Sequence, residues 1–294
     1  MEIKKVCVLG AGIMGSGIAQ VAAQAGFPVV MRDIENRFVD KGLAVIRQGL
    51  ERVVSKGKME AGEAMAVMAR LRGTTDLKGA LADADFVVEA VIEVMEAKKS
   101  VFKELDAFCK PTAILASNTS GLSITEMAAV TSRPDKVIGV HFFNPVPIMK
   151  LVEVVRTIAT APDVFETAYE FGKKLGKVPV RTSDKTGFIV NRIMVPYLLD
   201  AIRAYEEGVG SIEDIDNGIK LGMGHPMGPF TLLDFVGLDT TYYITQVMFD
   251  EFKEKRFASP PLLKRLVMAG WYGRKTGKGF YDYSNPEKPV AGRF

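Results

Sequence analysis

A glycine motif between a predicted strand and a predicted helix constrains the fold of this 294-residue chain more than any other feature. The apolar run KVCVL is followed by glycines at 10, 12 and 15, and a helical pattern continues to Ala25. In that setting the first glycine permits a tight turn, the second admits a phosphate group, and the third lets the helix pack on the sheet. The motif therefore predicts a dinucleotide site at the N-terminus of the helix. The residues expected to contact it are Gly10, Gly12, Ile13, Met14 and Gly15.

Strand-like and helical patterns alternate through the first part of the chain, which is typical of a mostly parallel sheet with crossover helices. With the glycine motif, the alternation predicts a Rossmann-type α/β domain. Residues 36–72 exceed what one crossover helix requires, so an inserted hairpin of two helices is expected there. The expected strands are KVCVL, PVVM, DFVVEAV, AILAS, KVIGVHF, LVEVV and KVPVR.

The pattern changes after Asp184, where helical periodicity replaces strands. We therefore predict a Rossmann-type domain over residues 1–184 and an all-helical domain over residues 185–294, with the polar segment SDKTG as the linker. The helices expected in the second domain span residues 188–208, 211–221, 229–236, 239–253 and 260–269.

Charge and cysteine content exclude several classes of protein. The formal net charge is only +3, and no basic run reaches a length typical of nucleic-acid binding. The uncharged run at residues 6–31 contains glycines, glutamines and a proline, so it divides into separate elements and is not expected to enter a membrane. Cys7 and Cys109 lack metal-ligand spacing, and we expect reduced thiols, no metal site and a cytoplasmic protein.

The choice of cofactor depends on the end of the second predicted strand. Asp33 stands where a carboxylate would accept hydrogen bonds from the adenosine ribose, which favours NAD. Arg32 beside it would instead suit a 2′-phosphate, so NADP stays open as the alternative.

One of only two histidines, His141, lies near the end of a predicted strand and precedes the turn sequence FFNPVP. Imidazole titrates near neutral pH, and ligands of α/β sheets bind at the carboxyl ends of strands. If LVEVV returns beside this strand, Glu153 can pair with the ring and fix its tautomer. The alternative is a histidine that only terminates a strand.

Six segments spread over nearly the whole chain resemble the L-3-hydroxyacyl-CoA dehydrogenases, most closely the single-function bacterial 3-hydroxybutyryl-CoA type. The resemblance implies reversible NAD-dependent oxidation of an L-3-hydroxyacyl-CoA and a homodimer, or a higher homo-oligomer, formed through the helical domain. The segments are VLGAGIMGSGIA, SNTSGLSI, HFFNPVPIMKLVEVV, GFIVNR, HPMGPF and GRKTGKGFYDY.

Site roles follow from this resemblance. His141 matches the family's catalytic base and Glu153 its partner carboxylate, while Ser120 and Asn191 match residues that hydrogen-bond the reacting oxygen or the thioester carbonyl. Asn118 is a further contact in the same loop. The simpler alternatives are that Ser120 caps the helix beginning LSITEM and that Asn191 bridges the domains.

Two further groups are carried over from the family. Glu93 and Lys98 match positions near the ribose and nicotinamide of the cofactor. Ser55, Lys56 and Lys58 lie in the predicted hairpin, where the family contacts coenzyme A, although a charged run is usually a solvated face. His225 lies among glycines and prolines and is expected in a turn.

The chain departs from the family at Gly121 and Thr186, where many relatives have serine and proline. Neither departure removes a proposed catalytic group. Two other functions remain open: a related NAD-dependent hydroxy-acid or sugar-acid dehydrogenase, and a nonenzymatic NAD-binding protein of crystallin type.

Overall fold

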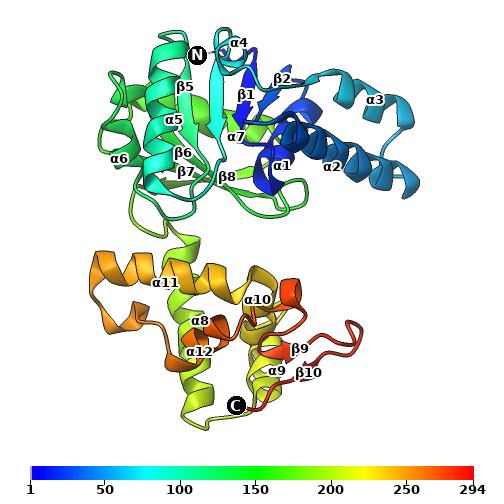
Figure 1. Ribbon diagram of the computed structural model, residues 1–294, viewed down its shortest axis with the longest axis vertical. Helices are drawn as coiled ribbons and strands as arrows, with labels where there is room; N and C mark the ends of the chain where they lie inside the picture. Colours follow the sequence, from blue (N-terminus) through cyan, green and yellow to red (C-terminus); the bar gives the residue numbers. More distant parts are fainter. Residues whose placement is uncertain (1) are drawn as a thin grey trace. The chain divides into compact units, whose positions relative to one another are not determined.

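The computed structural model describes residues 2–294 and divides into two compact units (Figure 1). The first unit extends to Phe188 and the second begins at Ile189, so the division falls after Phe188 and not after Asp184. The polar segment at 183–187 therefore belongs to the first unit, where Asp184 accepts hydrogen bonds from the backbone N–H groups of Ile124 and Thr125.

The first unit is built on an eight-stranded sheet with the order β3-β2-β1-β4-β5-β6-β7-β8. Strands β1 to β6 are parallel, β7 is antiparallel to β6, and β8 is parallel to β7. The predicted mostly parallel sheet is confirmed. The strands are β1 (Val6–Leu9), β2 (Val29–Arg32), β3 (Leu71–Thr74), β4 (Phe86–Glu89), β5 (Ile114–Ser117), β6 (Val137–Phe142), β7 (Leu151–Arg156) and β8 (Val178–Ser183).

Both faces of this sheet are covered by helices, which explains why its central strands are apolar throughout. In β1 the side chains of Val6 and Val8 enter one core cluster, and those of Cys7 and Leu9 enter the other. The first face carries α1 (Ile13–Gln24), α2 (Asn36–Ser55) and α7 (Pro162–Lys174), and the second carries α4 (Leu77–Leu81), α5 (Met95–Phe108) and α6 (Ile124–Ala128).

Both cysteines lie in the second of these clusters as free thiols. Burial raises the pKa of Cys7 and that of Cys109 to about 12. Since the thiolate is the reactive form, both side chains behave as small apolar residues of the core.

The region expected to hold a helical hairpin forms α2 and α3 (Ala61–Ala69), followed by β3. Strand β3 was not predicted from the sequence. Its four residues, LRGT, are not apolar throughout, and it lies at the sheet edge, where it pairs only with β2. An edge strand needs no continuous apolar pattern, because only part of it is buried.

The second unit is helical, as predicted, and its apolar core is separate from those of the sheet. One addition is a short antiparallel pair near the C-terminus, formed by β9 (Tyr281–Asp282) and β10 (Val290–Ala291). The helices are α8 (Val190–Glu206), α9 (Ile212–Gly222), α10 (Pro229–Val236), α11 (Leu238–Phe252) and α12 (Pro261–Met268).

A buried carboxylate in α10 holds the start of the C-terminal segment. Asp234 accepts the backbone N–H groups of Phe280 and Tyr281 at 2.9 and 2.8 Å, and the hydroxyl group of Tyr283 at 3.1 Å. The hydroxyl group of Tyr281 also donates to Asp216 in α9, at 2.9 Å, so two buried carboxylates attach the segment to the helices.

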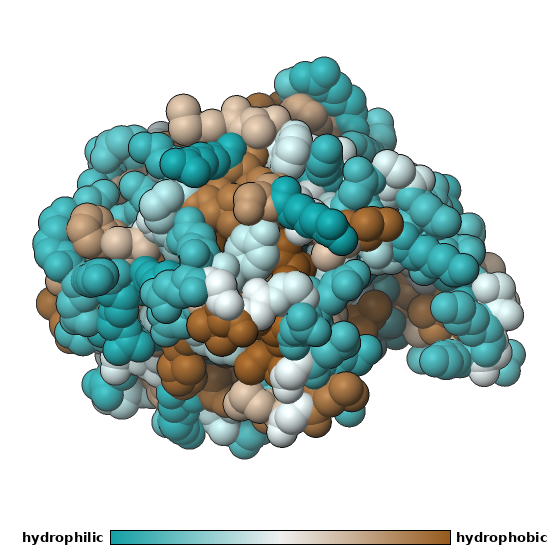
Figure 2. Space-filling view, turned by 90° about the horizontal axis from the view of Figure 1, so that it is seen from below, coloured by the Kyte–Doolittle hydropathy of each residue, from teal (hydrophilic) through white to brown (hydrophobic). Residues whose placement is uncertain are grey.

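The surface of the molecule is mixed in polarity. Figure 2 shows hydrophilic residues over much of one face, with apolar patches between them. In the second unit Val209, Leu221 and Met268 are at least 74% exposed. No helix within residues 2–294 has both the length and the apolar composition required to cross a membrane.

Candidate active site

The glycine-rich loop fits tightly between β1 and β4. Gly10 has φ +100°, and a Cβ atom added to it would lie 2.4 Å from the carbonyl oxygen of Ala90. A Cβ atom added to Gly15 would lie 1.8 Å from the carbonyl oxygen of Gly10. Both positions therefore require glycine, as the motif predicted.

Gly12 differs, because nothing lies within 4 Å of a Cβ atom built there. It is the N-cap residue of α1 and has no side-chain capping bond, which leaves the start of the helix accessible to a ligand. From β1 the chain builds the sheet outward in one direction to β3, and then returns to the other side of β1 at β4. Nucleotides bind α/β sheets at such a switch point. Open space at a helix N-terminus fits a pyrophosphate. Beside it, Ile13 is 75% exposed and Met14 is half-buried.

Asp33 follows β2 and faces the same loop. Its Oδ2 accepts the N–H of Ala11 at 2.7 Å, and its Oδ1 accepts the N–H of Ile34 at 2.7 Å. Each carboxylate oxygen has a second lone pair, so the carboxylate can still accept hydrogen bonds from ribose hydroxyl groups. Arg32 donates from Nε to the carbonyl oxygen of Thr75 at 3.3 Å.

His141 and Glu153 meet through the pairing of β6 with β7. The two residues are opposite each other in the antiparallel register, and Nδ1 of the ring lies 2.7 Å from Oε2 of the carboxylate. The histidine is 5% exposed and the glutamate is fully buried. Since a carboxylate accepts, Nδ1 carries the proton and Nε2 is the nitrogen that can exchange a proton with a substrate.

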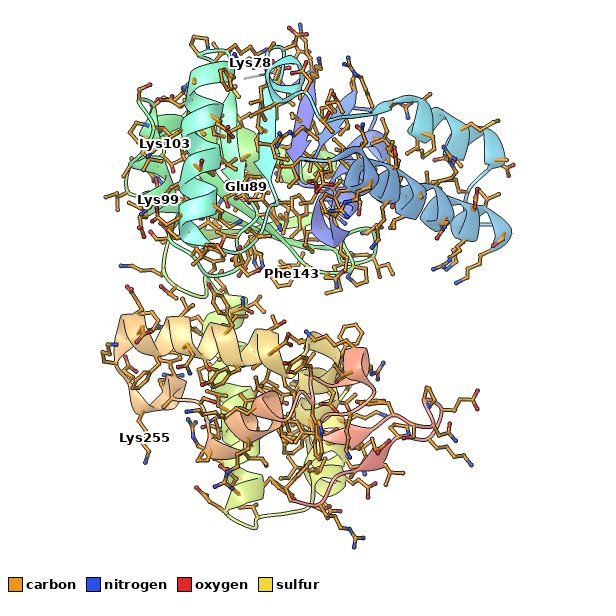
Figure 3. All side chains as sticks on the ribbon, viewed as in Figure 1. Lys78, Glu89, Lys99, Lys103, Phe143 and Lys255 are labelled. Carbon is orange, nitrogen blue, oxygen red and sulfur yellow. The ribbon has the colours of Figure 1, made fainter. Side chains whose placement is uncertain are left out.

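Two aromatic rings hold the imidazole from its sides. The ring of Phe143, labelled in Figure 3, has its centroid 4.6 Å from that of His141, and the ring of Phe188 has its centroid at 5.6 Å. Rings packed at these distances restrict rotation of the histidine side chain. Phe188 lies in the segment GFIVNR, and its contact with His141 was not predicted because the two residues are distant along the chain.

The segment SNTS begins at Ser117, the last residue of β5, and lies next to the strand that carries His141. Asn118 accepts the N–H of Phe142 at its Oδ1 atom, at 2.9 Å. Ser120 is half-buried, and its N–H donates to Oε1 of Glu93 at 2.9 Å. The alternative in which Ser120 caps α6 is wrong, because the cap is Ser123, whose hydroxyl accepts the N–H of Glu126.

Glu93 and Lys98 belong to a group of charges beneath this segment, in which Lys98 is buried and Glu93 is partly exposed. Lys98 is 1% exposed, and its Nζ atom lies 2.6 Å from Glu89 and 3.2 Å from Glu93. Sequence reasoning missed Glu89, which ends β4 and is labelled in Figure 3. The signal available was a carboxylate inside the otherwise apolar run FVVEAV.

Other predicted residues lie elsewhere. Asn191 is in the second unit, in the first turn of α8, and is 7% exposed. Ser55, Lys56 and Lys58 are exposed at the end of α2 and in the turn after it, on the hairpin that projects from the side of the sheet in Figure 1. His225 lies between α9 and α10, with its ring centroid 6.0 Å from that of Tyr197.

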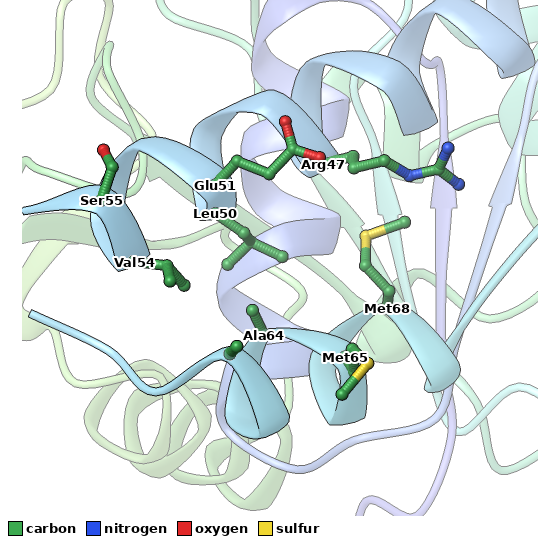
Figure 4. Close-up of a pocket in the computed structure, with 9 residues that line it drawn as sticks. Arg47, Leu50, Glu51, Val54, Ser55, Ala64, Met65 and Met68 are labelled. Atoms are coloured by element: carbon green, nitrogen blue, oxygen red, sulfur yellow. The ribbon is translucent and has the colours of Figure 1, made fainter. Parts of the chain in front are cut away.

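The same hairpin contains an apolar pocket of about 500 Å³ between α2 and α3 (Figure 4). Its existence depends on how the two helices are spaced, so the sequence did not predict it. The residues that line it are Arg47, Leu50, Glu51, Val54, Ser55, Ala61, Ala64, Met65 and Met68.

Comparison with protein families agrees with the two units. Residues 5–185 match the model described as 3-hydroxyacyl-CoA dehydrogenase, NAD binding domain. Residues 187–283 match the model described as 3-hydroxyacyl-CoA dehydrogenase, C-terminal domain. Together the two matches span most of the chain.

Individual relatives are similar over nearly their whole length. A probable 3-hydroxybutyryl-CoA dehydrogenase of Bacillus subtilis is 48% identical over 96% of this chain and 98% of that protein. The mitochondrial hydroxyacyl-coenzyme A dehydrogenase of Homo sapiens is 46% identical over 96% of this chain and 91% of that protein. A crystal structure of (S)-3-hydroxybutyryl-CoA dehydrogenase from Ralstonia eutropha is 42% identical, covers 97% of this chain and 100% of that one, and has a TM-score of 0.94.

Proposed function

Because this chain belongs to the 3-hydroxyacyl-CoA dehydrogenase family, whose first domain binds NAD, we propose that it interconverts L-3-hydroxyacyl-CoA and 3-oxoacyl-CoA reversibly. The substrate pair proposed is 3-hydroxybutyryl-CoA and acetoacetyl-CoA, in line with the names of its relatives. The single observation that carries the mechanism is the contact of 2.7 Å between Nδ1 of His141 and Oε2 of Glu153.

In the proposed oxidation, Nε2 of His141 removes the proton of the substrate's 3-hydroxyl group as the C3–H bond breaks. NAD⁺, when bound, supplies the acceptor for the hydride that leaves C3. In the reverse direction the imidazolium returns its proton to the carbonyl oxygen. An imidazole suits both directions, because it can accept a proton as a base and return it as an acid.

Glu153 is proposed to stabilise the imidazolium that forms in this step. Its carboxylate is fully buried, so its attraction to a neighbouring positive charge is weakly screened by water. The hydrogen bond to Nδ1 also fixes the orientation of the ring, which directs Nε2 at the substrate.

Ser120 and Asn191 are proposed to hydrogen-bond the reacting oxygen or the thioester carbonyl, with Asn118 as a further contact in the same loop. Placed donors of this kind orient a substrate and offset the negative charge that develops on oxygen. The half-buried position of Ser120, and the hydrogen bond that Asn118 accepts from the N–H of Phe142 beside His141, support the assignment of these two residues.

The residues of the nucleotide site fit NAD. Open space at Gly12 would admit the pyrophosphate, and Asp33 would accept the adenosine ribose hydroxyls. A 2′-phosphate would bring a second negative charge beside Asp33, and Arg32 is bonded to the carbonyl oxygen of Thr75. We therefore propose that NAD is preferred to NADP.

Exposed lysines at the end of the α2–α3 hairpin are proposed to meet the phosphates of coenzyme A. Lys56 and Lys58 are both exposed, and Ser55 lies beside them with its hydroxyl bonded to the carbonyl oxygen of Arg52. Lysine is a common phosphate ligand because its ammonium group is a compact positive charge.

The exposed apolar side chains of the second unit support association through its helices into a homodimer or a higher homo-oligomer. Light scattering coupled to size-exclusion chromatography tests this. Elution as a monomer at assay concentrations would contradict the proposed assembly.

The activity is tested by following NADH consumption with acetoacetyl-CoA and, separately, with free acetoacetate. The proposal predicts rapid consumption with the thioester and almost none with the free acid. Equal rates with the two substrates would contradict the coenzyme A assignment and favour a hydroxy-acid dehydrogenase.

A further inference from the structure

One buried carboxylate in the first unit holds the segment that carries Ser120, although it has no role in the mechanism above. Glu89 ends β4 and is fully buried. Its Oε2 accepts the hydroxyl of Ser117 at 2.6 Å, and its Oε1 contacts Nζ of Lys98 at 2.6 Å and the N–H of Val91 at 2.8 Å. Its backbone carbonyl also accepts the N–H of Asn118 at 2.8 Å.

These bonds continue along the SNTS segment. The hydroxyl of Ser117 accepts the N–H of Thr119 at 3.2 Å, and the hydroxyl of Thr119 donates to Oε1 of Glu93 at 2.5 Å. The same Oε1 atom accepts the N–H of Ser120. The backbone between β5 and Ser120 is therefore bonded to Glu89 at one end and to Glu93 at the other.

Lys98 joins the two carboxylates, but the two differ in exposure. The side chains of Lys98 and Glu89 are 1% and 0% exposed, whereas that of Glu93 is 35% exposed. Solvent competes with the bonds of Glu93 and does not reach those of Glu89. The fixed end of this arrangement is therefore the pair formed by Glu89 and Lys98.

A buried ion pair of this kind adds little net stability, because removing two charges from water offsets most of their attraction. Apolar residues of similar size would fill the same space. A carboxylate with two separate oxygen atoms can instead fix a backbone segment and a lysine in one geometry, which apolar packing does not do.

We propose that Glu89 is a positioning residue for the proposed dehydrogenase reaction. Acting through the Ser117 hydroxyl and Lys98, it holds the segment from Asn118 to Ser120 so that Ser120 can hydrogen-bond the reacting substrate. The inference rests on the proposed function, since it concerns the turnover of the same substrate.

Two substitutions test the Ser117 hydroxyl and the Glu89 carboxylate separately. Ser117→Ala removes the hydroxyl between Glu89 and Thr119 and retains the ion pair with Lys98. Glu89→Gln retains the size of the side chain and removes its charge. Because small displacements of reacting groups are costly, each is expected to lower kcat with acetoacetyl-CoA by up to about 100-fold. In Ser117→Ala the Kd for NADH, measured by its fluorescence, is expected to be unchanged.

The double variant shows whether the two residues act through one contact. If Glu89 positions Ser120 through Ser117, the double variant is expected to lose little more kcat than the more affected single variant. Independent losses that multiply would overturn the proposed route through Ser117.

The matched control is Asp85→Asn, at the residue just before the first residue of the same strand. Asp85 accepts the N–H groups of Lys4 and Lys5 at 2.8 Å and pairs with Lys110, so it is also a carboxylate that holds backbone and a lysine. This variant is expected to lower the Tm and leave kcat unchanged.

Failure of the proposed function and failure of the positioning role of Glu89 give different results. If the wild-type protein does not consume NADH with acetoacetyl-CoA, the proposed function fails and this inference fails with it. If the wild type is active and both Glu89→Gln and Ser117→Ala turn over at the rate of Asp85→Asn, the inference alone is overturned. If Glu89→Gln does not fold, Ser117→Ala decides between the same two results.

Discussion

His141 and Glu153 are direct partners in the antiparallel register of β6 and β7, with Nδ1 of the ring 2.7 Å from Oε2 of the carboxylate. Side chains of directly opposed residues project from the same face of a sheet and lie close together. The hydrogen-bonded ladder of the two strands thus sets the separation of base and carboxylate. A rigid backbone holds this pair better than two loops would.

Replacing Glu153 by glutamine is expected to lower kcat by at least about 100-fold, with little change in the Kd for NADH. Glutamine fills the same space, but its neutral amide does not stabilise the imidazolium. Steady-state kinetics with acetoacetyl-CoA, together with NADH binding, measure both quantities. Turnover within the experimental error of wild type would remove Glu153 from the mechanism.

The preference for NADH is expected to depend on Asp33. Because hydrogen bonds to charged groups are among the stronger ones, Asp33→Ala should raise the KM for NADH by about tenfold or more. The KM for NADPH should rise less or fall, since a negative charge beside the 2′-phosphate is removed. The ratio of kcat/KM for the two cofactors is the measurement, and an unchanged ratio would show that Asp33 does not select the cofactor.

The double variant Lys56→Glu with Lys58→Glu should raise the KM for acetoacetyl-CoA and leave the KM for NADH unchanged. The reason is that repulsion would replace attraction at the coenzyme A phosphates. Lys103→Glu, on the exposed surface of α5 and labelled in Figure 3, is a control of the same chemistry in a different place. If the KM for acetoacetyl-CoA is the same in the double variant and the wild type, Lys56 and Lys58 do not bind coenzyme A.

Much of the fold follows from the sequence, because its strongest signals are local. The glycine motif specifies a turn, and Gly10 and Gly15 occupy positions where any side chain would meet backbone. The return strand LVEVV was expected to place Glu153 beside His141, and their register agrees with it.

What the sequence did not reveal depends on packing between distant elements. Lys98 was expected near the cofactor from the family resemblance alone, and only the packing of α5 beside β4 buries it next to Glu89. Phe188, in the quoted segment GFIVNR, contacts the His141 ring although it lies 47 residues away along the chain. The cap of α6 is Ser123 instead of Ser120. The cap could have been predicted, because Ser123 and Glu126 form the S-x-x-E pattern of a capping box. The burial of Lys98 and the contact of Phe188 have no such local pattern.

The stability of the second unit is expected to depend on pH through Asp234. Burial raises the pKa of this carboxyl to about 6, in spite of the hydrogen bonds it accepts from Tyr281 and Phe280. A raised pKa in the folded state means that its contribution to stability is full below the unfolded pKa of about 4 and is lost as the pH rises to about 6. A shift of this size corresponds to a free energy on the order of 3 kcal/mol.

The measurement is the free energy of unfolding of the wild type and of Asp234→Asn at about pH 4 and about pH 7. The asparagine does not titrate, so the wild type should lose stability relative to the variant as the pH rises. At both pH values the variant also places an amide NH₂ group against backbone donors. A difference between the two proteins that is the same at both pH values would contradict the raised pKa.

The central claim is that His141 transfers the proton, and steady-state turnover of His141→Gln with acetoacetyl-CoA and NADH tests it most directly. Glutamine cannot act as a base near neutral pH, so kcat is expected to fall by about 100-fold or more. The Kd for NADH should be unchanged, because the glycine-rich loop and Asp33 are intact. Wild-type turnover in this variant would contradict the account.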